Sequence, residues 1–244
     1  MQKKTVSKVS SVGENISAEN ASWTFGDSVP TEFTEHVKRS VPYYESGHDV
    51  VCKISDFFLK DGSTCYELGV STGALIKKMS NHHRHRDVRF IGIDIEEKMI
   101  EQAQKEIGDD DKIQIIADDI NSFDYEPADL IVSYYTIQFV PPRLRQYLID
   151  TIFKSLNWGG AFLMFEKVRA CDARFQDMMT LLYSDYKLEQ GYSSEEIIAK
   201  SRSLKGVLEP FSTQGNIDLL KRAGFVDYMS VMKYLCFEGF LAIK

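Results

Sequence analysis

The sequence lacks the cysteine and hydrophobic patterns that mark several classes of protein. Its four cysteines are scattered and form no C-x-x-C pair, which argues against a zinc site and against a disulfide framework. It also contains no run of 18 apolar residues, so no membrane-spanning helix is expected. Residues 1–22 are polar and rich in serine, unlike the apolar core of a signal peptide. These absences predict a cytoplasmic protein with no metal site and no membrane partner, and a flexible tail at 1–22.

Basic residues are in the minority. Lys and Arg total 29 against 36 Asp and Glu, a formal net charge of −7, whereas binding to the phosphate backbone depends on an excess of Lys and Arg. General nucleic-acid binding is therefore not expected, and a small-molecule substrate is favoured. The 244 residues are 43% hydrophobic, enough for one large domain with its own core, which we place at 23–244.

One segment, 66–73, joins an apolar strand to a helix and reads Tyr66-Glu67-Leu68-Gly69-Val70-Ser71-Thr72-Gly73. The loop has two glycines, not the three of the G-x-G-x-x-G pyrophosphate fingerprint. It also carries Glu67, and an acid suits an ammonium better than a phosphate. Asp94, at the end of the next strand, can accept hydrogen bonds from both hydroxyls of a ribose. S-adenosylmethionine (SAM), which has a ribose and a cationic amino acid end but no phosphate, therefore fits better than NAD; a purely structural turn is the alternative.

Short apolar runs alternate with amphipathic helical stretches from residue 64 onward. Leu144, Leu148, Ile152 and Leu156 recur every four residues on one helical face, and Asn157 with Gly159-Gly160 ends that helix. This rhythm predicts parallel β–α units, and two closely spaced terminal strands predict an antiparallel hairpin. The fold class is therefore α/β, a Rossmann-like, mostly parallel sheet. The predicted strands are 64–68, 88–93, 113–116, 130–133, 161–165, 226–232 and 236–243.

An insertion follows the fifth predicted strand, at about 170–208. An apolar stripe at helical spacing runs through Phe175, Met178, Met179, Leu182, Tyr183 and Tyr186. A second helix is indicated by Ser194 with Ile197, Ile198 and Leu204. Such a pair of helices is typical of a lid or of an oligomer contact. Simple core packing is the alternative.

Several motifs together resemble one known family over nearly the whole chain. They are Trp23-Thr24-Phe25, Arg39-Ser40-Val41-Pro42-Tyr43-Tyr44, Thr136-Ile137-Gln138-Phe139, Asn157-Trp158-Gly159-Gly160-Ala161, Glu166-Lys167, Gly191-Tyr192-Ser193, Ala223-Gly224-Phe225 and Cys236-Phe237-Glu238-Gly239-Phe240. The sequence is similar to the carboxy-S-adenosylmethionine synthases, relatives of class I methyltransferases. The resemblance implies the class I methyltransferase fold, a homodimer paired through the insertion, and a carboxymethyl donor made for 5-oxyacetyluridine at the tRNA wobble position.

The resemblance also implies a set of cofactor contacts. Asp94 would bind the ribose, Asp119 would accept from the adenine amino group, Gly69 would lie at the amino acid end, and Tyr44 would lie over the sulfonium, where an aromatic face stabilises a cation. Both acids could instead be ordinary caps at strand-to-helix turns. The ligand would be SAM, S-adenosylhomocysteine or carboxy-S-adenosylmethionine. The full predicted set is Tyr44, Glu67, Gly69, Asp94, Ile95, Asp119, Ile120 and Tyr134.

Two positions depart from the family pattern. Tyr134 stands where the family has an Asn, and its hydroxyl would lie beside the sulfonium methyl unless the residue is simply a half-buried aromatic. Ser201 stands where the family has an Arg that holds the transferred carboxylate, and an Arg suits a carboxylate because its planar fork makes two parallel bonds. Arg202 is one residue away and could serve if the helix register shifts. Tyr134 and Arg202 are thus the catalytic candidates.

Three other polar groups invite a functional interpretation. His82, His83 and His85 suggest a metal site but lack acidic or cysteine partners, so a solvated loop is favoured. The carboxylates of 109–111 point in different directions on any backbone, which favours a solvated turn. Glu166-Lys167 could be a catalytic pair, although an ion pair closing the sheet is favoured.

The sequence leaves three functions open. The first is a SAM-dependent methyltransferase acting on a small molecule or a modified nucleoside by in-line displacement at the sulfonium carbon, which needs orientation more than acid–base chemistry. The second is a carboxy-S-adenosylmethionine synthase using SAM and prephenate. The third is a non-catalytic SAM-binding subunit, which would have no open cavity beside the sulfur.

Overall fold

The computed structural model describes residues 11–12, 16–17 and 29–244. Within the tail expected at 1–22, only β1 (Ser11–Val12) and β2 (Ile16–Ser17) are described, and they pair antiparallel with each other. The remainder of that tail and the motif at 23–25 lie outside the described residues. No described helix is both long and apolar enough to cross a membrane.

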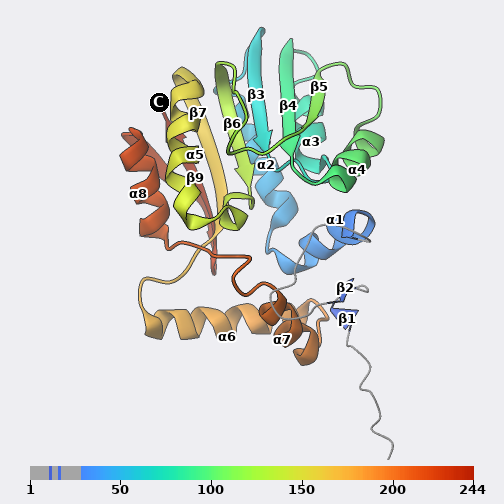
Figure 1. Ribbon diagram of the computed structural model, residues 1–244, viewed down its shortest axis with the longest axis vertical. Coiled ribbons are helices and arrows are strands. Elements are labelled where there is room, and N and C mark those ends of the chain that lie inside the picture. Colours follow the sequence, from blue (N-terminus) through green and yellow to red (C-terminus); the bar gives the residue numbers. More distant parts are fainter. Residues whose placement is uncertain (1–10, 13–15, 18–28) are drawn as a thin grey trace, which may run out of the picture.

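A seven-stranded sheet forms the centre of the molecule, in the order β5-β4-β3-β6-β7-β9-β8 (Figure 1). The first five are parallel, while β9 runs antiparallel to both β7 and β8. The parallel sheet with a terminal antiparallel hairpin is thereby confirmed. The strands are β3 (Ser63–Leu68), β4 (Val88–Asp94), β5 (Ile113–Ala117), β6 (Ala128–Tyr134), β7 (Leu156–Lys167), β8 (Asp227–Tyr234) and β9 (Phe237–Ile243).

Helices cover both faces of the sheet because the strands carry apolar side chains on both sides. One apolar cluster joins the sheet to α2 (Tyr44–Ser55) and α3 (Ala74–His82), and α4 (Glu97–Ile107) packs beside α3. A second cluster joins the opposite face to α5 (Pro142–Ser155) and α8 (Thr213–Ala223). These layers place the loops after β3, β4, β5 and β6 at one edge of the sheet, as in other doubly wound folds.

The start of the fifth parallel strand differs from the sequence prediction. β7 begins at Leu156, directly after α5, and Gly159-Gly160 lie within the strand rather than before it. A shift in register between Ala128 and Leu130 accommodates the extra residues. Gly159 has φ +78°, a conformation that favours glycine, so the glycines shape the strand and do not simply end the helix.

The insertion forms α6 (Ala173–Glu189) and α7 (Ser194–Ser203), which Figure 1 shows below the sheet. A capping box of Ser193 and Glu196 begins α7. Several hydrogen bonds tie the insertion to α1 (Val29–Ser40). Among them, Tyr183 donates to the Ser40 carbonyl at 2.8 Å, and the Arg39 guanidinium donates to the Gln190 carbonyl at 3.1 Å. One side of the insertion therefore packs against α1, and this side is called the lid below.

The prediction of a solvated histidine loop is wrong for His83. Its side chain is completely buried, with Nε2 2.6 Å from the Ser55 hydroxyl. His82 lies 2.9 Å from an Asp56 carboxylate oxygen, and Arg86 lies 3.5 Å from the other. Although Asp56, His82 and His83 gather closely enough to suggest a metal site, the hydrogen bonds and the Arg86 cation account for this cluster.

Candidate functional site

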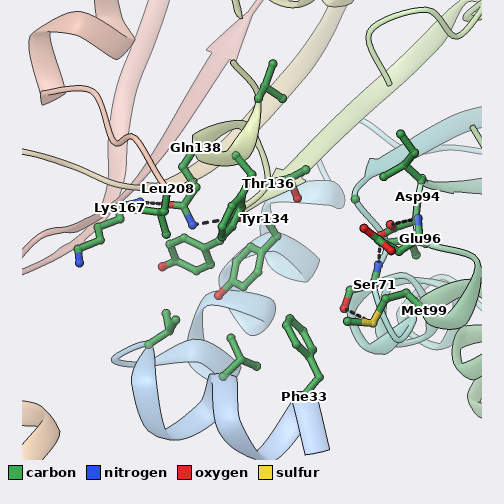
Figure 2. Close-up of a pocket in the computed structure, with 18 of the residues that line it drawn as sticks. Phe33, Ser71, Asp94, Glu96, Met99, Tyr134, Thr136, Gln138, Lys167 and Leu208 are labelled. Carbon is green, nitrogen blue, oxygen red and sulfur yellow. Dashed lines mark hydrogen bonds between the residues drawn. The ribbon is translucent and has the colours of Figure 1, made fainter. Parts of the chain in front are cut away.

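A cavity of about 460 Å³ lies at the carboxyl ends of the parallel strands, within the range of about 300–1,000 Å³ typical of ligand sites. Its walls come from the strand-end loops, from α1 and α2, and from α6 and α7. Figure 2 shows Asp94 and Glu96 on one side of it, Lys167 and Gln138 on the other, and Tyr134 between them. The position fits the rule that ligands of doubly wound sheets bind beyond the carboxyl ends of the strands.

The glycine loop forms one wall of this cavity, as the sequence predicts. Gly69 has φ +72°, and a Cβ placed on it would overlap with the Thr136 side chain. Its amide donates to the Ile93 carbonyl at 2.8 Å, which ties the loop to β4. Gly73 also has positive φ and begins α3. The two glycines thus let the loop adopt positive φ and pack closely against Thr136 and α4.

Asp94 is fixed by two backbone amides. One carboxylate oxygen accepts from the Ser71 amide at 2.8 Å, and the other accepts from the Glu96 amide at 3.0 Å (Figure 2). Burial raises the pKa of Asp94, although these amide bonds oppose that rise. Each carboxylate oxygen has two lone pairs, so both can accept a further bond from a ribose hydroxyl while the amides hold the group in place.

The next strand end supplies Asp119 and Ile120, which also line the cavity. One Asp119 oxygen accepts from the Asn121 backbone amide at 2.9 Å and from its side-chain amide at 2.7 Å. Ile120 is buried, whereas Ile95 lines the cavity with 65% of its surface exposed. An acid flanked by two apolar side chains suits an adenine, which has a hydrogen-bonding edge and an apolar face.

Glu67 is the clearest sign that a cation binds in this cavity. Its side chain is 3% exposed, and among the described residues its Oε2 has no hydrogen-bond partner. Burial raises the pKa of Glu67 well above its ordinary value. A buried acid with an unused oxygen, in a residue that lines a cavity, gains an interaction when an ammonium or sulfonium group binds beside it. The residues thus fit SAM.

Tyr44 and Tyr134 form an aromatic wall, but the Tyr134 hydroxyl does not point toward a transferable methyl group. It donates to the Tyr44 carbonyl at 2.7 Å and lies against Gly47, where a Cβ would overlap with it. Burial raises the pKa of Tyr134, so the hydroxyl stays protonated. The ring centroids of Tyr44 and Tyr134 are 5.3 Å apart, edge to face. Tyr134 therefore holds α2 through its hydroxyl, and the residue lines the cavity.

The structure does not bring Arg202 to the cavity. Both Ser201 and Arg202 are exposed, and the Ser201 hydroxyl donates back to the Ile197 carbonyl at 2.8 Å. Lys200 and Leu204 of this segment line the cavity instead. Each residue of a helix is rotated by roughly 100° from the last, so the face that packs on α1 carries Lys200 and turns Arg202 to solvent.

Glu166 and Lys167 do not form the ion pair favoured from the sequence. Successive residues of a strand point to opposite faces, so the two side chains separate. Glu166 is buried, accepts from the Ile137 amide at 3.1 Å, and has its pKa raised by burial to about 8. Lys167 lines the cavity together with Tyr183 and Phe237. The alternation of side chains along a strand could have predicted from the sequence that Glu166 and Lys167 point to opposite faces of the sheet.

This fold and this cavity define a class I methyltransferase domain. The family model described as a methyltransferase domain matches residues 66–160. Among solved structures, human N-acetylserotonin methyltransferase in complex with SAM matches with a TM-score of 0.61 and 18% identity, covering 88% of this chain and 55% of that one. A putative SAM-dependent methyltransferase of Methanococcus maripaludis matches with a TM-score of 0.60 and 20% identity, covering 91% and 95%.

Sequence similarity identifies the family within that class. Carboxy-S-adenosyl-L-methionine synthase of Staphylococcus epidermidis is 39% identical over 223 residues, which cover 91% of this chain and 97% of that protein. The enzyme of the same name from Sulfurimonas denitrificans is 36% identical over 225 residues, covering 90% and 94%. The chain belongs to the carboxy-S-adenosyl-L-methionine synthase family. It is a SAM-dependent transferase, and SAM is its cofactor.

Proposed function

We propose that the protein is a carboxy-S-adenosyl-L-methionine synthase that uses SAM and prephenate. The similarity to proteins of that name supports this proposal. The observation that carries it is the extent of the cavity, which continues from the acids at the strand ends past Tyr134 to Lys167. A cation at the far end suits a reaction in which a carboxylate is transferred, because a buried carboxylate needs a positive partner.

The residues of the chain bind and orient the reactants. SAM, when bound, supplies a methyl carbon made reactive by the adjacent positive sulfur. Glu67 would hold the cationic end, Asp94 the ribose and Asp119 the adenine, while the Tyr44 ring would face the sulfonium. The lid formed by α1, α6 and α7 would exclude water from the reacting groups.

A plain methyltransferase is the second candidate, favoured by Ser201 in place of the family Arg and by the exposure of Arg202. The third interpretation, a non-catalytic subunit, expects a nucleoside pocket with no open space beyond it. The cavity instead extends to Tyr183, Lys167 and Phe237.

Mass spectrometry of reaction mixtures tests the proposal. Purified protein with SAM and prephenate should convert SAM into a sulfonium product heavier by one carbon dioxide. Omission of prephenate should abolish that product, and Asp94→Ala should slow its formation. Absence of the carboxylated product, together with formation of S-adenosylhomocysteine when an acceptor is supplied, would favour the methyltransferase.

The proposal includes a setting for the enzyme. The product would supply the carboxymethyl group for wobble uridine in tRNA, as the family resemblance implies. All four cysteines are free, which supports a reducing, cytoplasmic location. The chain would act as a homodimer on small molecules, without general nucleic-acid binding.

A further inference from the structure

Charges of opposite sign occupy different parts of the cavity. Its described lining includes five acids and two lysines. The acids lie on β3, at the end of β4 or on the loops after β4 and β5: Glu67, Asp94, Glu96, Asp118 and Asp119. The lysines are Lys167 and Lys200. Figure 2 shows Asp94 and Glu96 across the cavity from Lys167. The acids suit the cationic and hydroxyl groups of SAM, which leaves the lysines for a different, anionic group.

Lys167 reaches the cavity from the end of β7, beside the strand that carries Tyr134. Its ammonium lies 4.3 Å from the centroid of the Tyr183 ring and 6.0 Å from that of Phe237. Within the described part of the chain, no carboxylate contributes to its electrostatic surroundings. Burial lowers the pKa of Lys167. Aromatic faces stabilise a cation less than a carboxylate does, so an anion entering the cavity would complete the surroundings of this group.

Lys200 enters the cavity from the lid. Its ammonium contacts Nε2 of the buried His36 on α1, and burial lowers the pKa of Lys200 to about 7. His36 and Ser40 are one helical turn apart on α1. The Ser40 carbonyl accepts a hydrogen bond from the hydroxyl of Tyr183, whose ring contacts the Lys167 ammonium. Lys200 and the Tyr183 ring beside Lys167 are therefore both tied to α1.

A series of aromatic rings leads from the cofactor side of the cavity to Lys167. Successive centroid distances are 5.3 Å from Tyr44 to Tyr134, 4.8 Å to Tyr135, 5.7 Å on to Phe237 and 5.3 Å to Tyr183. Such a wall packs well against a planar or nearly planar ring. A ligand with a ring and a carboxylate matches this arrangement of aromatic faces and ammonium groups.

We propose that Lys167 and Lys200 bind the carboxylate of a ring-bearing second substrate, whose ring packs on the aromatic wall of the cavity. The inference rests on the proposed function and assigns its second substrate to residues of this chain. It also explains how a member of this family with Ser201 can bind a carboxylate: the ammonium of the preceding residue faces the cavity.

Calorimetry on protein saturated with S-adenosylhomocysteine tests the assignment without turnover, because this ligand has no transferable methyl group. Prephenate is titrated into wild type, Lys167→Met, Lys200→Met and the control Lys205→Met, which replaces an exposed lysine outside the cavity. Each cavity variant should lose about tenfold to a hundredfold in affinity, the usual effect of one charged hydrogen bond, and Lys205→Met should not. Phenylacetate should bind better than phenylacetamide, which has the same ring without the charge.

Two controls distinguish a lost carboxylate contact from a misfolded variant. Affinity for S-adenosylhomocysteine reports whether each variant is folded, and Lys167→Arg should retain most of the prephenate affinity because it keeps the charge. Prephenate affinity unchanged in both methionine variants, or no binding to wild type, would overturn the assignment. Lysine-dependent binding without a carboxylated product from SAM would support the assignment and contradict the proposed function instead.

Discussion

Glu67 provides a direct test of how the cavity recognises a cation. Burial raises the pKa of Glu67 well above its ordinary value in the free protein, so this carboxyl keeps its proton to a higher pH than an exposed glutamate does. A sulfonium or ammonium group beside the unpartnered Oε2 would lower that pKa. Binding of SAM should then release up to one proton. Below the pKa of the free protein, the affinity should rise about tenfold per pH unit, or about 1.4 kcal/mol.

Calorimetry of SAM binding in two buffers of different ionisation enthalpy measures the proton directly. Wild type should release a proton at a pH below the Glu67 pKa of the free protein, and Glu67→Gln should release none. Above the pKa of Glu67, the variant should also bind SAM more weakly by roughly 1.5–3 kcal/mol, because it lacks the charge. Glu166→Gln is the matched control: Glu166 is equally buried but does not line the cavity. No proton release in wild type, or equal release in Glu67→Gln, would refute the reasoning.

Four further outcomes are expected. Asp94→Ala should weaken S-adenosylhomocysteine binding by roughly 1.5–3 kcal/mol; unchanged affinity, or tighter binding of NAD, would contradict the ribose assignment. Arg202→Ala should leave the preference between SAM and its carboxylated form unchanged in competition binding, because Arg202 is exposed; a preference that vanishes would mean that Arg202 is the clamp. Light scattering should show a homodimer, since the outer face of α6 exposes apolar side chains, including Leu181, which is 67% exposed. Leu181→Asp should weaken the dimer, and a wild-type monomer at micromolar concentration would contradict this prediction. Glu166 has a pKa of about 8 in the folded protein, above its unfolded value, so it contributes stability that is lost as pH rises from about 4.5 to 8. In denaturant unfolding, Glu166→Gln should reduce this loss of stability with pH. An identical pH profile in the variant would show that another group titrates.

The fold and the cofactor side of the cavity follow from the order of residues along the chain. Alternating strands and helices dictate a parallel sheet, and in such a sheet the carboxyl ends of the strands meet at one edge. Glu67 and Gly69 at the end of β3, Asp94 at the end of β4 and Asp119 after β5 are therefore brought together wherever the helices pack. All four line the cavity.

The lid side depended on tertiary packing. Whether Lys200 or Arg202 of α7 faces the cavity is decided by how that helix lies on α1, through His36, and a rotation of roughly 100° per residue makes neighbouring positions point apart. The inward direction of Lys167 is likewise set by the face of β7 that the sheet turns toward the lid. Local sequence determines which residues occur at a strand end or on a helix, but the rotation of each element about its own axis is fixed only by the surfaces that it buries.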